Sequence, residues 1–235
     1  MNDDVRSYIV EFIGPFALMF VGGGAIIATD GRDLLAIALA HGLAIGLMIA
    51  AAGHISGGVY NPAITIGLMA TRKLPPVKGL IYIVMQCLGA TVAAAVLRFA
   101  TPGATVNVTP TLGPGVSVAQ GFVVELILTF FLMFAIFGSA IDKRGPATIA
   151  GLVIGLTISI DILVGGPITG ASMNPARSFG PAVVYGVWND HWLYWIATSL
   201  GAVLAALLYN DVLLGPDVPK IEPAVQLPQE AGSPR

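Results

Sequence analysis

The sequence predicts an all-α membrane protein in which six transmembrane helices and two half-length helices form an inverted repeat. Three observations support this fold class: a charge-poor composition, six long apolar segments, and two Asn-Pro-Ala triplets at matching places in the two halves of the chain. Of the 235 residues, 56% are hydrophobic and 10% are charged, whereas about a quarter of the residues in a soluble domain are charged. This composition excludes a soluble domain, and a net charge of -2 provides no basic surface for nucleic acid.

Each apolar segment is long enough to cross a bilayer, which takes about 20 residues of helix. Clusters of Gly, Pro and Asp, which favour turns, separate the segments. The polar, Pro-rich remainder, residues 215–235, is expected to be a disordered cytoplasmic tail. The predicted spans are Val5–Thr29, Leu34–Gly53, Val77–Ala100, Val118–Ile141, Ala147–Gly165 and Trp192–Leu214.

The basic residues predict the orientation in the membrane. With a cytoplasmic N-terminus, most Lys and Arg residues fall inside, and only Arg32, Arg98 and Arg177 fall outside or near the outer face. Cytoplasmic loops carry an excess of Lys and Arg, so both termini are expected in the cytoplasm. We expect an integral, multi-pass protein of the plasma membrane, although the sequence names no organelle.

The two halves of the chain repeat one another. Glu11 begins the stretch EFIGPFALMF and Glu125 begins ELILTFFLMF. Asn61 follows Glu11 by 50 residues, and Asn174 follows Glu125 by 49. Each half holds three spans, an odd number, so the second half is inverted and the functional site is expected where the repeats meet near the membrane midplane. The first half comprises residues 1–117 and the second residues 118–214.

Each Asn-Pro-Ala triplet is a helix start. Asn is a favoured N-cap, Pro fits the first helical position, and Ala favours continuation of the helix. The apolar run after each triplet has room for about 10 residues of helix, or about 15 Å, which is half of the hydrocarbon core. Because the halves are inverted, the two half-helices enter from opposite sides and their N-termini can meet at the centre. The residues of the triplets are Asn61, Pro62 and Ala63, and Asn174, Pro175 and Ala176.

The segments that lead to the triplets, 53–58 and 165–172, are rich in glycine and are expected to be non-helical. Non-helical backbone at this depth is stable only where protein buries it or water lines it, which favours a pore. One side of each segment would present carbonyl oxygens to the lumen, and the Asn amides would add N–H donors where the carbonyls end. The carbonyls expected to line the pore are those of Gly57, Gly58, Val59, Gly170, Ala171 and Ser172.

The stretches GHISGGVYNPAITIG and GASMNPARSFGPAV, together with the duplicated halves, resemble the aquaporin (major intrinsic protein) family as far as Leu214. The resemblance implies an aquaporin-like fold of six tilted helices and two half-helices, and a homotetramer in which each protomer has its own pore. It also implies that Asn61 and Asn174 are pore donors, and that Glu11 and Glu125 brace the re-entrant loops. No nucleophile–base pair, metal cluster or phosphate loop appears, so we expect no enzyme, no metal and no cofactor.

The resemblance further implies a selectivity filter. Its positions correspond to His41 in the second span, Ile162 in the fifth, Ala171 in the second loop and Arg177 after the second triplet. This set, with the phrases HISGG, SMNPARSFGPAV and HWLYW, is most similar to the plant tonoplast aquaporins. It differs from water-only members, which have Phe and His at the first two positions. A His and an Ile in their place imply a wider constriction with one apolar side.

The expected function is a passive water channel that moves solute in single file and excludes protons and cations. The wider filter leaves ammonia, hydrogen peroxide and urea open as further solutes. A glycerol facilitator is an alternative. Such members carry Asp directly after the filter Arg, where this chain has Ser178, and they usually lack the aromatic pair Tyr194-Trp195. Both features favour a water-type channel.

Asp161 departs from the tonoplast pattern, which tends to have Asn at this place. An acid within a span is a functional candidate by default, and two interpretations stay open. In one, Asp161 is protonated or faces a subunit interface; in the other, it shifts His41 toward its charged form. A coupled secondary transporter also uses inverted repeats and broken helices, but only Glu11, Glu125 and Asp161 are available as carboxylates for a coupling ion.

Overall fold

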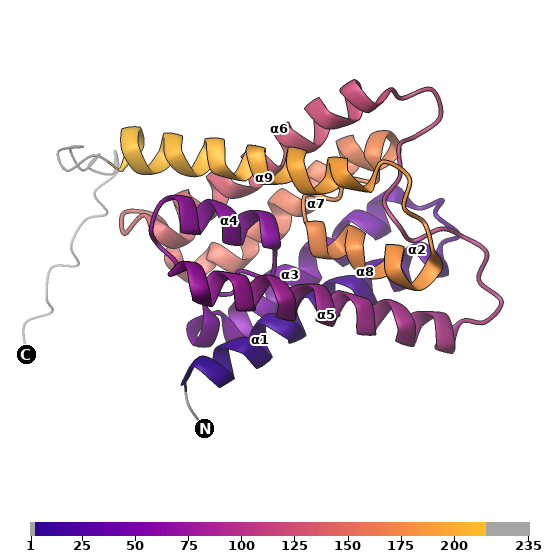
Figure 1. The fold of residues 1–235 in the computed structure, drawn as a ribbon, viewed down its shortest axis with the longest axis horizontal. Helices are drawn as coiled ribbons and strands as arrows, with labels where there is room; N and C mark the ends of the chain where they lie inside the picture. The colour runs from indigo at the N-terminus through magenta and orange to yellow at the C-terminus, as the bar shows by residue number, and fades with distance from the viewer. Residues whose placement is uncertain (1–2, 215–235) are drawn as a thin grey trace, which may run out of the picture.

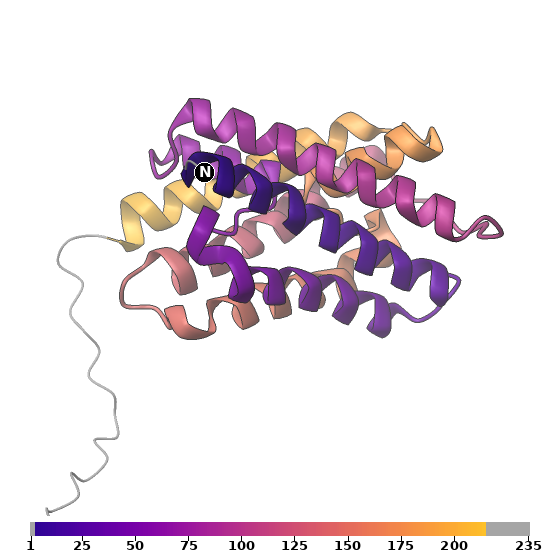
Figure 2. The same cartoon turned by 90° about the horizontal axis from the view of Figure 1, so that it is seen from below.

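The computed structural model describes residues 3–214, and all of its regular secondary structure in this range is helical, without a β-strand. Six of its helices are long and apolar enough to cross a membrane. The helices run along the long axis of the molecule, and both ends of the described chain lie at the same end of the bundle (Figures 1 and 2). The prediction of an all-α membrane protein with six spans and two half-helices is confirmed. The tail expected over residues 215–235 lies outside the described residues.

The order of elements is the same in both halves: a first span, a second span, a half-helix and a third span. The first half contains α1 (Asp3–Ala17), the π-helical turn η1 (Leu18–Gly22), α2 (Gly23–Ala28), α3 (Leu34–Ser56), α4 (Pro62–Ala70) and α5 (Pro76–Ala100). The second half contains α6 (Val118–Ile136), the π-helical turn η2 (Phe137–Ile141), the 3-10 turn η3 (Ala147–Ile149), α7 (Ala150–Thr169), α8 (Pro175–Tyr185), α9 (His191–Leu208) and the π-helical turn η4 (Tyr209–Leu213).

The half-helices interlock the two repeats. The first half-helix, α4, packs against α9 in the second half, and α8 packs against α5 in the first half (Figure 1). A helix of 9 residues or 11 residues is too short to span the bilayer. Each half-helix therefore needs a span of the other repeat beside it, and this exchange brings the tips of α4 and α8 together.

The second spans of the two halves, α3 and α7, cross in close contact through glycines. A Cβ atom added at Gly42 would lie 2.2 Å from the carbonyl oxygen of Gly155, and one added at Gly155 would lie 2.5 Å from that of Gly42. Gly46 and Gly151 meet in the same reciprocal way, at 2.7 and 2.6 Å. Small residues allow helix backbones to approach in lipid, where packing drives association. The glycines thus set the spacing of the two repeats.

The expectation that residues 53–58 and 165–172 are non-helical is wrong for most of their length. Helices α3 and α7 each continue to the residue before a glycine. That glycine, Gly57 or Gly170, adopts a left-handed conformation with φ of 95° or 78° and ends the helix, as glycine does at many helix C-termini. The non-helical stretch is therefore only the four residues before each Asn.

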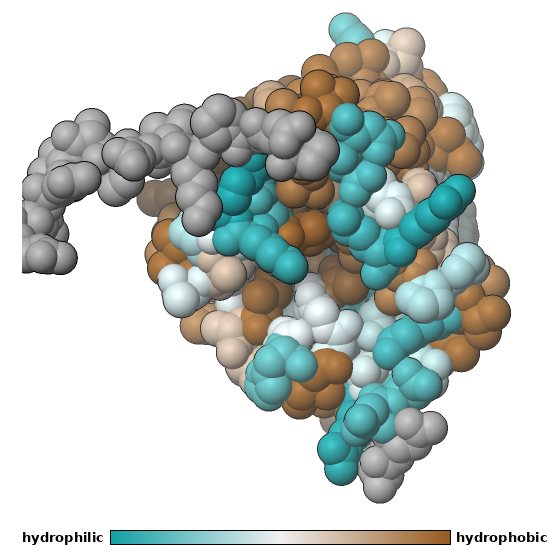
Figure 3. All heavy atoms as spheres, turned by 90° about the vertical axis from the view of Figure 1, so that its left-hand side faces the viewer, coloured by the Kyte–Doolittle hydropathy of each residue, from teal (hydrophilic) through white to brown (hydrophobic). Residues whose placement is uncertain are grey.

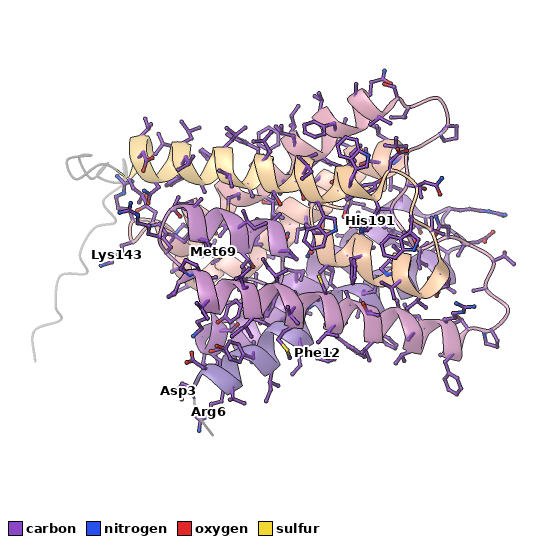
Figure 4. All side chains as sticks on the ribbon, in the orientation of Figure 1. Asp3, Arg6, Phe12, Met69, Lys143 and His191 are labelled. Carbon is purple, nitrogen blue, oxygen red and sulfur yellow. The ribbon has the colours of Figure 1, made fainter. Side chains whose placement is uncertain are left out.

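The outer surface has an apolar belt and a polar end. Exposed Leu, Ile, Val and Phe side chains cover the spans. Hydrophilic residues gather at the end of the bundle that carries the termini (Figure 3). Asp3, Arg6 and Lys143 lie at this end, whereas His191 lies toward the opposite one (Figure 4). A surface of this kind suits a bundle surrounded by lipid and wetted at its ends.

At the polar end, the loop after η2 is fastened to the last span. Arg144 donates from Nη2 to Asp142 Oδ2 at 2.6 Å and to the carbonyl oxygen of Leu213 at 3.0 Å. The hydroxyl of Tyr209 donates to the same carboxylate at 3.3 Å. The guanidinium of Arg144 lowers the pKa of the Asp142 carboxyl to about 2, so the pair holds the loop over the whole physiological pH range.

Candidate functional site

A cavity of about 350 Å³ lies between the two halves. It is lined by η1, α3, α4 and the loop after α4 from the first half, by α6, η2, α7 and α8 from the second, and by the two loops that precede the half-helices. Most lining side chains are apolar, and Ile and Leu are the commonest among them. Among the described lining residues, Lys73 and Arg177 carry a permanent positive charge and none is acidic. The cavity is therefore apolar along its walls and positive in its fixed charge.

Both half-helices begin as the triplet chemistry requires. The Oδ1 of Asn61 accepts from the backbone N–H of Ala63 at 2.9 Å, and the Oδ1 of Asn174 accepts from that of Ala176 at 3.0 Å. A proline occupies the first helical position in each case, where its missing N–H costs no hydrogen bond. The side-chain oxygens are thus used for capping, and the NH2 groups are left for other partners.

The NH2 groups of the two Asn side chains join the halves by reciprocal hydrogen bonds. Asn61 Nδ2 donates to the carbonyl oxygen of Met173 at 2.7 Å, and Asn174 Nδ2 donates to that of Tyr60 at 3.0 Å. We call these two bonds the seam. The sequence pattern predicted that the whole NH2 group faces the pore and did not indicate Tyr60 and Met173 as acceptors. Each amide has two N–H bonds, so one N–H of each is left without an acceptor among the described residues.

Tyr60 and Met173 have an unusual backbone conformation. Their φ angles are 52° and 51°, in the left-handed region that residues with side chains rarely adopt. Each directly precedes the Asn of its triplet, and the turn aims its carbonyl at the opposite half. The sequence held one signal for these two acceptors: Tyr60 and Met173 occupy equivalent positions in the two halves, and a repeat places equivalent residues on both sides of its axis.

Glu11 holds the first loop from within α1. Its Oε1 accepts from the backbone N–H of Val59 at 3.0 Å and from the hydroxyl of Ser56 at 2.6 Å. Its Oε2 accepts from the backbone N–H of Tyr60 at 2.8 Å and from Gln86 Nε2 at 2.7 Å. The carboxylate is fully buried, and such a group is stable in the interior only with several donors around it. These contacts fix the strained turn at Tyr60.

Glu125 holds the second loop in the same way from α6. Its Oε1 accepts from the backbone N–H of Ser172 at 2.7 Å and from the hydroxyl of Thr169 at 2.6 Å. Its Oε2 accepts from the backbone N–H of Met173 at 2.8 Å. No side chain in residues 3–214 plays the part here that Gln86 plays beside Glu11. Within this range, Glu125 therefore accepts from three donors and Glu11 from four.

The four expected filter residues all line the same cavity. Arg177 donates from Nη1 to the carbonyl oxygens of Gly170 and Ala171 at 2.9 and 2.8 Å, which leaves the donors on Nε and Nη2 without an acceptor among the described residues. His41 is 1% exposed, and its Nδ1 lies 2.8 Å from the carbonyl oxygen of Ile37. A carbonyl can only accept, so Nδ1 carries the proton and Nε2 is free. Ile162 adds an apolar wall.

Five of the six residues expected to present carbonyls to the pore line the cavity, and the carbonyl ladders themselves stay a prediction. Gly170 is not among the residues that line the cavity; its carbonyl accepts from Arg177 and its backbone ends α7. The carbonyl of Ala171 also accepts from Arg177. The acceptors of the seam, Tyr60 and Met173, lie one residue beyond the expected ladders. The remaining expected residues line the cavity: Gly57, Gly58, Val59, Ala171 and Ser172.

Asp161 and His54 lie away from the cavity. Asp161 is 5% exposed, and its Oδ2 has no hydrogen-bond partner among the described residues. It is not a lining residue, and no described contact joins it to His41. The interpretation in which Asp161 tunes His41 thus has no contact to act through. His54, at the end of α3, is exposed and lines outer clefts.

Lys73 lines the cavity at the polar end, a position that no sequence pattern indicated. It follows α4, where Arg72 adopts φ of 58° and the backbone N–H of Lys73 donates to the carbonyl oxygen of Leu68 at 2.8 Å. Its Nζ lies 5.7 Å from the centre of the Phe137 ring. A cation over an aromatic face near a helix C-terminus is favourably placed. The cavity thus has Lys73 near one end and Arg177 near the other.

Comparison with known proteins agrees with this architecture. Residues 2–209 match the family described as Major intrinsic protein. The chain is 41% identical to Aquaporin TIP4-4 of Zea mays, over 89% of this chain and 87% of that protein. It is 40% identical to Aquaporin TIP2-1 of Arabidopsis thaliana, over 90% and 88%. The solved aquaglyceroporin of Plasmodium falciparum is 29% identical and superposes with a TM-score of 0.81, over 89% of this chain and 97% of that one. The chain belongs to the major intrinsic protein family.

Proposed function

We propose that this protein is a passive water channel whose pore is the cavity between the two halves. The seam carries this conclusion: two half-helix tips meet, and each presents one unused amide N–H beside a carbonyl acceptor of the other half. A water molecule passing this point can accept from the Asn amides while apolar side chains line most of its path. The family relationship to proteins named aquaporin supports the same function.

Charge exclusion follows from the same arrangement. Each half-helix N-terminus carries a partial positive charge of about half an elementary charge, and the two tips point at one place. Arg177 and Lys73 add full positive charges along the cavity, and no described lining residue is acidic. A cation, including a hydrated proton, therefore meets repulsion at three levels, whereas a neutral hydrogen-bonding solute does not.

The filter residues determine which neutral solutes pass beside water. We propose that His41, Ile162, Ala171 and Arg177 form this constriction, and that it admits ammonia, hydrogen peroxide and urea. Glycerol is the second candidate, because a solved relative is named as an aquaglyceroporin. Ser178, buried behind Arg177, donates to the backbone carbonyl of Pro175 at 3.0 Å and offers no carboxylate beside the arginine, which favours water over glycerol.

Stopped-flow light scattering on proteoliposomes tests the proposal. Purified protein is reconstituted without an ion gradient, and water, ammonia, urea and glycerol permeabilities are measured beside empty liposomes and a His41→Phe variant. We expect fast osmotic shrinkage, a smaller glycerol flux, and a narrower solute range in His41→Phe. Glycerol flux above water flux would favour the facilitator. Shrinkage no faster than in empty liposomes would reject the channel and favour a coupled transporter.

Assembly and location are further parts of the proposal. By family resemblance we propose a homotetramer with one pore per protomer and with both termini in the cytoplasm, as the Lys and Arg distribution favours. Native mass spectrometry in detergent tests the first and protease protection tests the second. The TIP names of the plant relatives favour a vacuolar membrane over the plasma membrane expected from the sequence. Membrane fractionation distinguishes the two.

A further inference from the structure

The first span contains a π-helical turn, η1, beside the filter. The turn ends at Gly22, whose φ of -68° and ψ of -47° are ordinary helical values, so the backbone itself does not require glycine here. Space requires it instead. A Cβ atom added at Gly22 would lie 2.3, 2.4 and 2.6 Å from Cδ2, Nε2 and Cε1 of His41. Contacts of about 3.4 Å or more are ordinary, so the imidazole ring rests directly on the glycine backbone.

The ring of His41 is held between Gly22 and the lumen. His41 lines the cavity and Gly22 does not. The Nδ1–H of His41 donates to the carbonyl oxygen of Ile37, one turn earlier on α3, at 2.8 Å. This tether and the buried environment, with 1% exposure, leave the ring one open side, which is the cavity. A side chain at position 22 would therefore displace the ring into the pore.

The second half of the chain does not have this device. Gly22 lies 11 residues after Glu11, and the residue 11 after Glu125 is Ile136. The side chain of Ile136 lines the cavity itself, and the π-helical turn of that span, η2, begins only at Phe137. The repeat architecture therefore does not demand a glycine at this place. The π-helical turn of the second half also contains a glycine, Gly138, but at a different position, so a glycine at the position of Gly22 belongs only to the half that carries His41. π-helical turns are often found at functional sites.

We infer that Gly22 is a positioning residue that sets the width of the pore at His41, by letting the imidazole stand back from the lumen. Restoring an ordinary contact of 3.4 Å from 2.3 Å requires a movement of about 1 Å. That distance is large beside a constriction sized for single water molecules. The inference rests on the proposed function, since it assumes that solute passes His41. It adds a residue outside the pore lining to those that determine selectivity.

Four variants in proteoliposomes test the inference: Gly22→Ala, Gly24→Ala, His41→Ala and the double variant Gly22→Ala/His41→Ala. Gly24 lies two residues from Gly22, and a Cβ there would meet its nearest atom, Leu97 Cδ2, at an ordinary 3.7 Å. It is the matched control. The readout is the osmotic water permeability per reconstituted channel. Permeability is also measured for urea, which is larger than water, and for ammonia, which is of comparable size to water.

We expect Gly22→Ala to lower water permeability by about tenfold, equivalent to about 1.4 kcal/mol of barrier, and to lower urea permeability further. Gly24→Ala should match the wild type. In the His41→Ala background, Gly22→Ala should have no further effect, because the ring through which it acts is gone. A Gly22→Ala channel with wild-type permeability, or an equal loss in both backgrounds, would overturn the inference.

Folding of the variants is checked by size-exclusion chromatography and thermal unfolding. If Gly22→Ala alone fails to assemble, a double variant that assembles and conducts like His41→Ala supports the contact, whereas a double variant that also fails overturns it. Wild-type protein that conducts no water rejects the proposed function instead. In that case the inference about pore width is rejected with it. If the wild type conducts water and the Gly22→Ala variant has the same permeability, only the inference is rejected.

Discussion

Glu125→Gln tests how strongly one carboxylate holds the second re-entrant loop. The carboxylate accepts three hydrogen bonds, at 2.6, 2.7 and 2.8 Å. An amide of the same shape keeps one acceptor oxygen and turns the other into a donor, so the N–H of Met173 loses its acceptor. A buried N–H without an acceptor costs about 1–3 kcal/mol, and each of the two remaining bonds weakens by about 1 kcal/mol when the acceptor loses its charge. We expect the free energy of unfolding to fall by about 3–5 kcal/mol.

The same substitution reaches the pore, because the carbonyl oxygen of Met173 accepts from the amide of Asn61 in the seam. A loosened turn at Met173 displaces this acceptor, so water permeability should fall together with stability. Unfolding is measured by titration with sodium dodecyl sulfate in mixed micelles, followed by tryptophan fluorescence. Water permeability is measured by stopped flow on the same preparation.

Glu11→Gln is the matched variant in the first half. Gln86 donates to Glu11 at 2.7 Å, and a reversed Gln86 amide can accept from the new NH2 group, which recovers one contact. Among the residues that the structure describes, no side-chain amide donates to Glu125, so we expect the loss of stability to be smaller for Glu11→Gln. Equal losses for the two variants, or a loss below about 1 kcal/mol for Glu125→Gln, would show that hydrogen bonds to the loops do not account for the brace.

Three further predictions concern the seam, the helix crossing and the polar end. Asn61→Asp keeps the cap oxygen but places a negative charge where two helix tips supply about one positive charge in total. We expect this variant to let cations leak through proteoliposomes, and a cation permeability equal to that of the wild type would contradict this. Gly155→Ala puts a Cβ 2.5 Å from a carbonyl of α3 and should cost about 1–3 kcal/mol, whereas Gly53→Ala, with its nearest contact at 3.4 Å, should leave the unfolding midpoint unchanged. Because Arg144 holds the pKa of Asp142 at about 2, below its ordinary value of about 3.9, their pair stabilises the fold above that ordinary value and loses this effect as the pH falls through about 2. The stability advantage over Asp142→Asn should vanish across that interval, and an advantage that does not change with pH would refute the assignment.

Capping chemistry explains why the half-helices could be predicted. The interaction of Asn61 Oδ1 with the N–H of Ala63 spans two residues, and the same holds for Asn174 and Ala176. Hydropathy over about 20 residues likewise predicts a span without knowledge of its neighbours. The prediction that the glycine-rich segments 53–58 and 165–172 are non-helical was wrong, because glycine can lie within a helix as well as end one. Gly57 and Gly170 end helices, and the glycine-rich residues before them remain helical.

The filter set of His41, Ile162, Ala171 and Arg177 was predicted only through family resemblance, because its members lie on different elements. They line one cavity, and their role as a filter stays a prediction. Nothing local to His41 indicates that Gly22 lies against its ring, and nothing local to Lys73 indicates that it lines the cavity. Asp161 shows the reverse case. Its sequence position beside Ile162 suggested a role at the pore, but on a helix adjacent residues point in directions about 100° apart, and Asp161 does not line the cavity.

The six spans, the inverted order of the two halves and the two half-helix starts follow from the amino-acid sequence, because hydropathy and capping act within one span or one turn. Which carbonyls receive the Asn amides depends on how the two halves pack. The two seam bonds join residues 112 and 114 positions apart, and no local rule selects Tyr60 and Met173 over their neighbours. Their carbonyls are in reach because Glu11 and Glu125, each on a different span, hold the turns in a left-handed conformation.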